Sequence, residues 1–245
     1  ELVTRLDEMG AELSISSMRI KPPSPIVLNR IIKGGARTIA LAPEAGSERL
    51  RRVIGKGFTE EDILKAIDEV ARQGIRQLKL YFMIGLPTET DGDIRQLAQL
   101  ALAAREIIDK KRAATRLTIN VTPFIPKAQT PFQWLPLVAP DVIDNRISII
   151  KSALTKKRIK LKCDSSKWSL VQGVLARGDA KLCNVFSKMR KTTLAEWNRA
   201  MAECGLSAEQ YILRQISPDE PLPWARIDSG TSQEKLIREL SVALA

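Results

Sequence analysis

The sequence predicts an α/β fold in which an array of strand–helix units is followed by a mostly helical region. Short apolar runs typical of buried strands alternate with amphipathic helical segments in the first half of the chain. The connections between them are short and marked by Gly and Pro. After Asp141 the alternation stops and helical patterns prevail. Such alternation is typical of a parallel sheet, either an open doubly wound sheet or part of a β/α barrel.

The first elements are placed by periodicity and by helix start signals. Residues 13–20 alternate between apolar and polar side chains, which predicts a strand. A helix is predicted over residues 25–33 and a short apolar strand over 38–42. Thr59 is followed three residues later by Asp62, a spacing typical of the capping box that opens a helix.

The next units continue the same alternation. Residues 77–84 predict a strand, and a Gly-Leu-Pro turn ends it. Thr90 and Asp93 predict the start of a long helix. Residues 116–121 predict a further strand, which leads into a stiff loop over 123–136. In both candidate folds the ligand site lies at the carboxyl ends of the strands, so we expect the site there.

The remaining part of the chain is predicted to hold one more strand among helices. Residues 158–163 have the alternation of a strand. Ser207 with Gln210, and Thr231 with Glu234, have the spacing of capping boxes. The later part of the chain is therefore expected to be mainly helical.

Composition excludes several classes of protein. The 245 residues are 44% hydrophobic and 27% charged, which is ordinary for a globular protein. No stretch of 18 apolar residues occurs, and the first residues do not form a signal peptide, so we expect a cytoplasmic protein without a membrane span. The absence of histidine excludes a histidine-dependent triad or zinc site within the chain. Cys163, Cys183 and Cys204 lack metal-ligand spacing and are expected to be reduced core residues.

Positive charge is concentrated in the middle of the chain. The net charge is +11, and residues 105–191 carry 19 Lys and Arg against 6 Asp and Glu. One interpretation is a solvated surface, and the other is a surface for an anionic partner. The densest group of cations is Lys151, Lys156, Lys157, Arg158, Lys160 and Lys162.

Three segments at strand ends carry the candidate chemistry. In the first, over 42–50, the carboxylate of Glu44 is suited to accept hydrogen bonds from a ribose diol. The alternative there is a plain turn, with Glu44 solvated and Ser47 capping a helix. The second segment, 80–90, is a buried strand followed by a turn and a helix cap. The third, 123–134, is rich in proline and aromatic residues and could form either an apolar wall for a flat ring or a structural loop.

Taken in this order and spacing, the segments resemble the radical S-adenosylmethionine (radical SAM) superfamily. Glu-Ala-Gly-Ser-Glu-Arg-Leu at 44–50 is similar to the ribose segment of that superfamily's fourth strand, and Gly-Leu-Pro-Thr-Glu-Thr at 85–90 is similar to its fifth-strand segment. Residues 123–134, 175–179 and 221–224 resemble a poorly characterised subfamily, which often carries a cobalamin-binding-type domain upstream.

This resemblance implies a division of the chain. Residues 1–140 would form the second half of a radical SAM partial β/α barrel, and 141–245 a basic, mainly helical carboxyl-terminal region. Since the sequence opens in the last turns of a helix with no strand before it, we expect further β/α units upstream of Glu1. The superfamily binds its 4Fe–4S cluster through a Cys-x3-Cys-x2-Cys triplet that this chain lacks, so we expect those ligands upstream too. The chain alone is then expected to be inactive.

The resemblance also implies a site for SAM. Glu44 would bind the ribose hydroxyls, and Lys56 would bind the SAM carboxylate through its point charge. The other residues expected in this site lie at or near the ends of successive strands: Ser17, Arg19, Ser47, Ile84, Gly85, Phe124 and Ile125. The resemblance assigns no catalytic or metal-ligating residue within the chain.

The implied function is that of a radical SAM iron–sulfur enzyme, an oxidoreductase. Such an enzyme reductively cleaves SAM to a 5′-deoxyadenosyl radical, which abstracts hydrogen from the substrate. We expect methyl or methylthio transfer first among the reactions, and cobalamin as a further cofactor of the full-length protein. The expected partners are an electron donor for the cluster and an unidentified substrate, with RNA or another anionic macromolecule as one option, and no membrane.

The alternative is a nucleic-acid-binding module that uses the basic region 105–191. The aromatic content of 4% offers such a module few platforms for base stacking. The sequence also lacks an RNA-recognition or zinc-binding signature. The basic region itself is the observation that favours this alternative.

Overall fold

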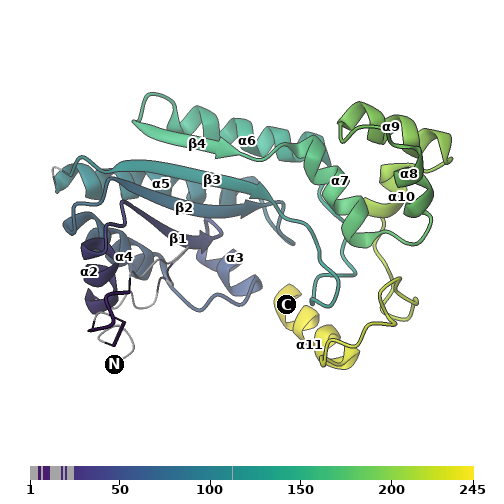
Figure 1. The fold of residues 1–245 in the computed structure, drawn as a ribbon, viewed down its shortest axis with the longest axis horizontal. Coiled ribbons are helices and arrows are strands. Elements are labelled where there is room, and N and C mark those ends of the chain that lie inside the picture. The colour runs from purple at the N-terminus through teal and green to yellow at the C-terminus, as the bar shows by residue number, and fades with distance from the viewer. Residues whose placement is uncertain (1–4, 7, 12–17, 19, 21–24, 112) are drawn as a thin grey trace. The chain divides into compact units, whose positions relative to one another are not determined.

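The computed structural model describes the chain over residues 5, 6, 8–11, 18, 20, 25–111 and 113–245 (Figure 1). Strands and helices alternate up to residue 163, and helices follow from there to the carboxyl end. In chain order the elements are α2 (Pro25–Lys33), β1 (Thr38–Glu44), α3 (Glu48–Val53), α4 (Glu60–Arg72), β2 (Gln77–Ile84), α5 (Asp91–Lys110), β3 (Arg116–Pro123), α6 (Pro140–Leu154), β4 (Ile159–Cys163), α7 (Ser166–Arg177), α8 (Leu182–Lys188), α9 (Leu194–Glu203), α10 (Ala208–Ile212) and α11 (Gln233–Leu244).

The described residues form two compact units. The first takes the chain up to Ile84 together with Glu89–Thr122 and Arg146–Cys163. The second takes Gly85–Thr88, Pro123–Asn145 and Asp164–Ala245. The expected division into 1–140 and 141–245 stays a prediction.

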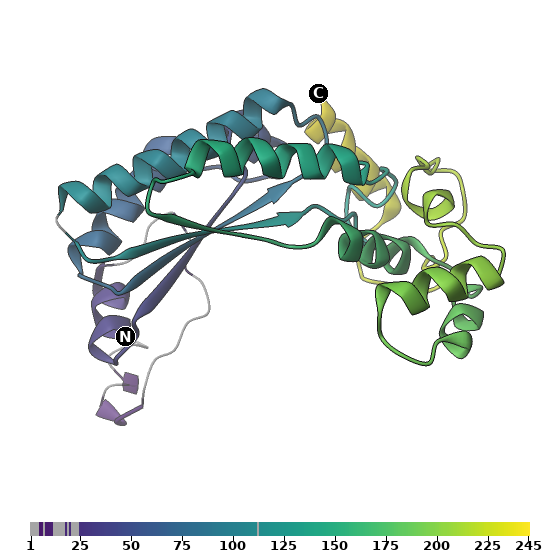
Figure 2. The same cartoon turned by 90° about the horizontal axis from the view of Figure 1, so that it is seen from above.

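The first unit is built on one sheet whose strands lie in the order β1-β2-β3-β4. The strands run the same way in Figure 1, and the pairs β1–β2 and β3–β4 are parallel. Helices α5 and α6 lie on the same face of the sheet (Figure 2). Because each new strand adds beside the previous one without a reversal of strand order, the winding is that of a partial barrel rather than a doubly wound sheet.

The sheet continues beyond β1 toward the amino end of the chain. Met18 forms a parallel bridge with Leu41, and its N–H donates to the carbonyl of Ala40 at 3.0 Å. Since Leu41 also pairs with Leu80 of β2, Met18 lies on the opposite edge of β1. The predicted strand over 13–20 otherwise falls outside the described residues, as do the site residues Ser17 and Arg19.

The core of the first unit lies between the sheet and its helices. In β2 the even-numbered residues are buried, whereas Tyr81 on the other face is 39% exposed. This alternation is expected when only one face of a strand packs against helices. From the helical side, the buried face of α4 contributes Ile63, Ile67 and Val70. Helix α4 also contacts α5.

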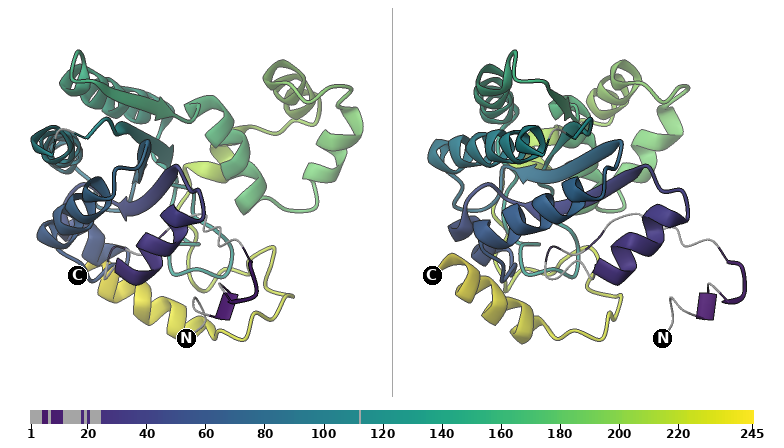
Figure 3. Two further views of the ribbon diagram at one scale, coloured as in Figure 1. Left: turned by 60° about the vertical axis from the view of Figure 1, so that its left-hand side comes forward. Right: turned by 90° about the vertical axis from the view of Figure 1, so that its left-hand side faces the viewer.

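The second unit is mainly helical, and its helices α7 to α10 gather together (green in Figure 3). A buried apolar cluster that includes Val174, Val185 and Trp197 forms its core. The proline-rich loop is joined to the end of α10 by backbone hydrogen bonds. Leu137 donates to the carbonyl of Ile212, and Ile216 donates to the carbonyl of Trp134, both at 2.8 Å.

Most predicted elements match the structure closely. The helix over 25–33 and the strand over 77–84 are confirmed with the same bounds. The capping boxes at Thr59 and at Thr90 are confirmed, each with its aspartate bonded back to the cap residue. The strands predicted over 38–42 and 116–121 each extend by two residues, to Glu44 and Pro123, and the last strand begins one residue late, at Ile159.

Two local predictions are wrong. Helix α11 is capped by Ser232 rather than Thr231, because Ser232 Oγ accepts from the N–H of Lys235 at 3.3 Å. Two adjacent hydroxyl residues can both cap a helix, so spacing alone does not select between them. The expectation of core cysteines is wrong for Cys163 and Cys183, which are exposed, whereas Cys204 is partly buried and packs against the apolar core of the second unit. Cys163 ends β4, the last strand of the sheet, where burial is incomplete.

Within the part of the chain that the structure describes, no helix is both long and apolar enough to span a bilayer.

Candidate functional site

The carboxyl end of β1 departs from regular strand geometry at Glu44. The pairing with β2 shifts by one residue between Leu41 and Glu44, which is a bulge. Glu44 has a φ of 68°, in the left-handed region that non-glycine residues adopt at a cost. The N–H of Ala45 donates to the carbonyl of Pro43 at 2.8 Å, so a three-residue turn closes around Glu44. Strain of this kind concentrates at functional sites, which makes Glu44 a candidate for one.

The side chain of Glu44 is partly exposed and meets one cation. Its Oε1 lies 3.3 Å from Nζ of Lys56, which follows helix α3. The two side chains are 24% and 41% exposed. Within the described residues Oε2 has no hydrogen-bond partner, so it is available to a ligand. The structure thus brings together the two residues that the sequence assigns to the ribose and the carboxylate of SAM.

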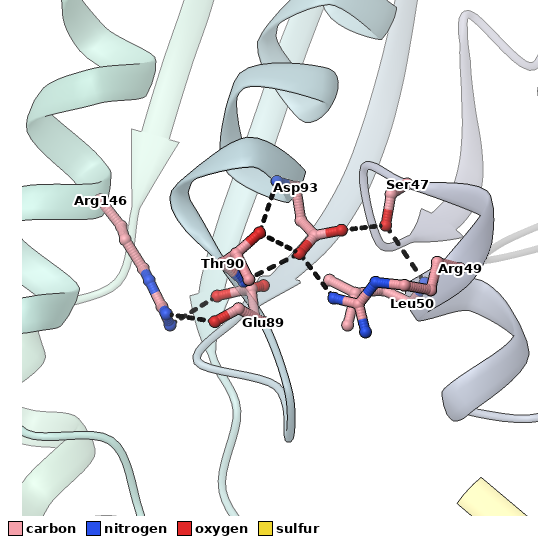
Figure 4. Close-up of polar contacts among 7 residues, drawn as sticks. All are labelled: Ser47, Arg49, Leu50, Glu89, Thr90, Asp93 and Arg146. Atoms are coloured by element: carbon pink, nitrogen blue, oxygen red, sulfur yellow. Dashed lines mark hydrogen bonds and ion pairs between the residues drawn. The ribbon is translucent and has the colours of Figure 1, made fainter. Parts of the chain in front are cut away.

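Ser47, three residues further on, is buried, and its side chain forms a hydrogen bond with the backbone. Its Oγ accepts from the N–H of Leu50 and caps α3, which matches the structural alternative considered for this segment. The same hydroxyl donates to Oδ1 of Asp93 at 2.5 Å (Figure 4). Gly46 permits this close approach, because a Cβ there would lie 2.4 Å from the backbone nitrogen of Leu97. A direct contact between Ser47 and SAM stays a prediction.

Asp93 joins the two predicted SAM segments. Besides Ser47, it accepts from the N–H and Oγ1 of Thr90 at 2.8 and 2.7 Å and from Nη2 of Arg49 at 2.7 Å. Burial by itself would raise the pKa of this carboxyl, but the hydrogen bonds from Ser47, Thr90 and Arg49 outweigh it and lower the pKa to about 2. Asp93 is therefore a fixed anion that holds the loop after β1 against the start of α5.

A buried ion pair fixes the other side of the same helix start. Nη1 of Arg146 lies 2.7 Å from Oε2 of Glu89, and its Nη2 donates to the carbonyl of Glu89 at 2.8 Å. The two side chains are 8% and 2% exposed. Figure 4 shows Arg146 and Asp93 approaching the Glu89–Thr90 dipeptide from different elements. The end of the Gly-Leu-Pro-Thr-Glu-Thr segment is thus held by two sets of charged contacts.

The remaining predicted site residues are distributed over both units. Ile84 is fully buried at the end of β2 in the first unit. Gly85 belongs to the second unit, and its φ of 81° suits glycine. Phe124 packs edge-on against Phe132, with ring centroids 5.7 Å apart. Ile125 is 8% exposed and belongs to the apolar core of the second unit. Their contact with SAM stays a prediction.

Sequence reasoning misses Arg146 and the hydrogen bonds by which Asp93 links the loop after β1 to the start of α5. The signal for Arg146 is its position in α6, where it shares helical spacing with the buried residues Ile143, Ile150 and Leu154. A charged residue within an apolar stripe indicates a buried partner. The sequence identifies Asp93 only as a helix cap, because its bond to Ser47 joins residues 46 positions apart.

The comparison with protein families agrees with the motifs at these strand ends. Residues 1–101 match the family model of the radical SAM superfamily. Residues 1–101 are therefore a radical SAM domain. The radical SAM superfamily is a family of enzymes, and a match to it implies SAM and a 4Fe–4S cluster as cofactors.

Two curated proteins are similar to parts of this chain. An uncharacterized protein of Methanocaldococcus jannaschii is 37% identical over 193 residues, which make up 79% of this chain and 41% of that protein. The chain therefore spans about two fifths of that relative's length. An uncharacterized methyltransferase of Pyrococcus horikoshii is 26% identical over 102 residues, 41% of this chain and 22% of that protein.

Solved structures add little to this assignment. A sugar phosphate isomerase/epimerase from Parabacteroides distasonis aligns over 90% of this chain and 87% of that chain. The sequence identity is 12% and the TM-score is 0.29. So weak a likeness indicates nothing about function.

The described residues offer groups of the kind that SAM needs but no ligand set for the cluster. Glu44 and Lys56 offer an acceptor and a cation side by side at a strand end. By contrast, no group of three or more Cys, His, Asp or Glu within the described residues is placed to hold a metal. The three cysteines lie on β4, on α8 and at the end of α9. The described residues therefore supply no ligand set for the cluster.

We predict that this chain, reconstituted anaerobically with iron and sulfide, forms no stoichiometric 4Fe–4S cluster. The reason is that a cluster of this type needs thiolates gathered at one point. The measurement is iron and sulfide content together with the visible absorption of the protein after desalting. Four irons per chain with a cluster chromophore would contradict the prediction.

Proposed function

We propose that this chain provides the SAM-holding half of a radical SAM enzyme, with Glu44 as the ribose ligand and Lys56 as the carboxylate ligand. The observation that carries the proposal is the strained turn at Glu44, whose partly exposed carboxylate lies at the end of β1 and pairs, among the described residues, with Lys56 through one oxygen. Backbone strain at a residue whose side chain is held only by a partly exposed ion pair is consistent with a ligand site. The family match over residues 1–101 supports the same assignment.

The other residues act by positioning. Asp93 and Arg146 fix the start of α5, and Ser47 fixes the loop that carries Glu44. Rigid support of this kind keeps a binding group within the narrow geometry that a reactive ligand requires. When bound, SAM supplies the reactive adenosyl and methyl groups, and the protein supplies binding, orientation and shielding.

The proposed overall reaction is methyl transfer, with methylthio transfer as the second possibility considered. The partial match to a protein described as an uncharacterized methyltransferase supports the first. Since the chain spans about two fifths of its relative from M. jannaschii, the proposal places the cluster ligands in a part of the protein beyond this chain.

Glu44→Gln tests this proposal in the protein that carries both this chain and the cluster ligands. Glutamine keeps the size of the side chain but loses the charge that strengthens hydrogen bonds to two ribose hydroxyls. We expect SAM affinity to fall by about ten- to a hundred-fold, or about 1.5–3 kcal/mol. Isothermal titration calorimetry with SAM measures this change.

Glu48→Gln is the matched control. Glu48 lies four residues away in α3, where its carboxylate pairs with Arg52 in solvent. Its replacement should leave SAM affinity unchanged, because surface ion pairs of this kind contribute little. Equal SAM affinity in the wild type and in Glu44→Gln would remove Glu44 from the site. A large fall in melting temperature for Glu44→Gln would instead show a structural role.

A further inference from the structure

The first unit contains a basic cavity at the opposite end of its sheet from Glu44. The cavity has a volume of about 710 Å³ and is lined by the first residues of β2, β3 and β4. Gln77, which opens β2 and lines the cavity, lies seven residues before Ile84 at the carboxyl end. At about 3.3 Å per residue, the two ends of this strand are about 23 Å apart. The cavity is therefore separate from the SAM residues of this unit.

The lining is strongly cationic. None of the lining residues that the structure describes is acidic. The five described cations come from α5, β3, β4 and the residue before β4: Arg105, Arg116, Arg158, Lys160 and Lys162. A concave site with cations and no carboxylate in its wall concentrates positive potential and attracts anions.

Only part of this charge is neutralised within the protein. Arg105 and Arg158 share the carboxylate of Asp109, each with a nitrogen–oxygen distance of 2.7 Å. In the described part of the chain, the side chains of the other three cations, Arg116, Lys160 and Lys162, form no hydrogen bond or ion pair. With one carboxylate for five described cations, the cluster keeps a net positive charge, which favours binding of a multiply charged anion.

Neutral polar groups line up beside these cations. Lys160 and Lys162 alternate along β4, so both point to one face of the sheet. On β3 they pair with Thr118 and Asn120, and Gln77 Nε2 donates to Thr118 Oγ1 at 2.9 Å. Of these groups, Gln77 and Thr118 line the cavity, so they add neutral polar contacts beside the cations.

We propose that this cavity binds phosphate groups, supplied either by the phosphate chain of a nucleotide or by the backbone of a nucleic acid. Arginine and lysine in this arrangement are suited to several phosphate oxygens at once. Among its described residues the lining has no aromatic side chain on which a base could stack, so recognition is through phosphate and independent of base sequence. This site goes beyond the proposed SAM chemistry, and its failure would leave that proposal intact.

The test uses the 245-residue chain and two probes, inorganic tripolyphosphate and a fluorescein-labelled single-stranded oligouridine. The test variant is Lys160→Glu with Lys162→Glu, which reverses two charges of the cavity wall. The matched control is Lys156→Glu with Lys157→Glu, which reverses two exposed lysines of the same basic stretch that do not line the cavity. Circular dichroism and the thermal midpoint confirm that both variants are folded. Arg116→Gln replaces the test variant if that one is unfolded.

We expect the wild type and the control variant to bind, and the cavity variant to bind at least tenfold more weakly. For oligouridine, the slope of log affinity against log salt should flatten by about 1.4, since each phosphate contact to a single strand contributes about 0.7. Binding of tripolyphosphate alone identifies a nucleotide-type ligand, and binding of oligouridine alone identifies a nucleic acid. No binding of either probe at low salt would overturn the proposal. Equal losses in the two double variants would also overturn it, because they would show diffuse surface charge.

Discussion

Replacing Arg177 by leucine should lower the free energy of unfolding by about 3–5 kcal/mol, the largest effect expected for any single substitution considered. Arg177 ends α7 and is 4% exposed. Its guanidinium donates to the carbonyls of Leu135, Tyr211 and Arg214, which belong to two other segments of the second unit. Leucine leaves these carbonyls without their donor, and each buried unsatisfied group costs about 1–3 kcal/mol.

The charge state of Arg177 does not weaken this expectation. Burial and the nearby Arg214 lower its pKa to about 10, against the raising effect of Glu220. The group therefore remains protonated at neutral pH and donates from every nitrogen. Denaturant unfolding of the wild type and the variant measures the difference.

Arg238→Leu is the control for this prediction. Arg238 lies exposed on α11, so its replacement should change stability by no more than about 0.5 kcal/mol. Arg177→Lys should give an intermediate loss, because one ammonium cannot reach carbonyls on two segments with fixed geometry. A loss below about 1 kcal/mol for Arg177→Leu would show that the three carbonyls find other donors.

Asp93→Asn should lower the free energy of unfolding by about 2–4 kcal/mol at neutral pH. The hydrogen bonds that hold the pKa of Asp93 near 2 stabilise the folded state by about 2 kcal/mol relative to an ordinary carboxyl. Asparagine adds a further cost, because its amide donors would face Thr90, Arg49 and Ser47, which are themselves donors.

The same substitution should change how stability depends on pH. The pKa of Asp93 is lower in the folded than in the unfolded state, so its stabilisation is complete above about pH 4. It is lost as the pH falls from about 4 to about 2. Asp93→Asn should therefore remove this part of the acid dependence, as measured by urea unfolding at about pH 7 and about pH 3.

Asp91→Asn provides the comparison within the same helix turn. Asp91 is exposed at the first position of α5, so its loss should cost only the modest interaction with the helix dipole. If Asp93→Asn and Asp91→Asn have the same stability at both pH values, Asp93 does not hold the loop after β1 against α5.

Elements and motifs that depend on neighbouring residues can be predicted from the amino-acid sequence. The capping boxes at Thr59 and Thr90 need partners only three residues away, and both are present. The strand over 77–84 follows from its own apolar run, and the strand-end segments at 42–50 and 80–90 lie within the family match over residues 1–101. Such signals can be recognised without knowledge of the rest of the chain, because the interactions that produce them are local.

Contacts between residues far apart in the sequence are visible only in the folded chain. The contact between Ser47 and Asp93 joins residues 46 positions apart, and that between Arg146 and Glu89 joins residues 57 apart. The positive φ of Glu44 follows from a bulge against β2, and the basic cavity needs β4 paired beside β3. These contacts cannot be predicted from spacing along the chain, because parallel strands bring distant segments together only after the helices between them have packed.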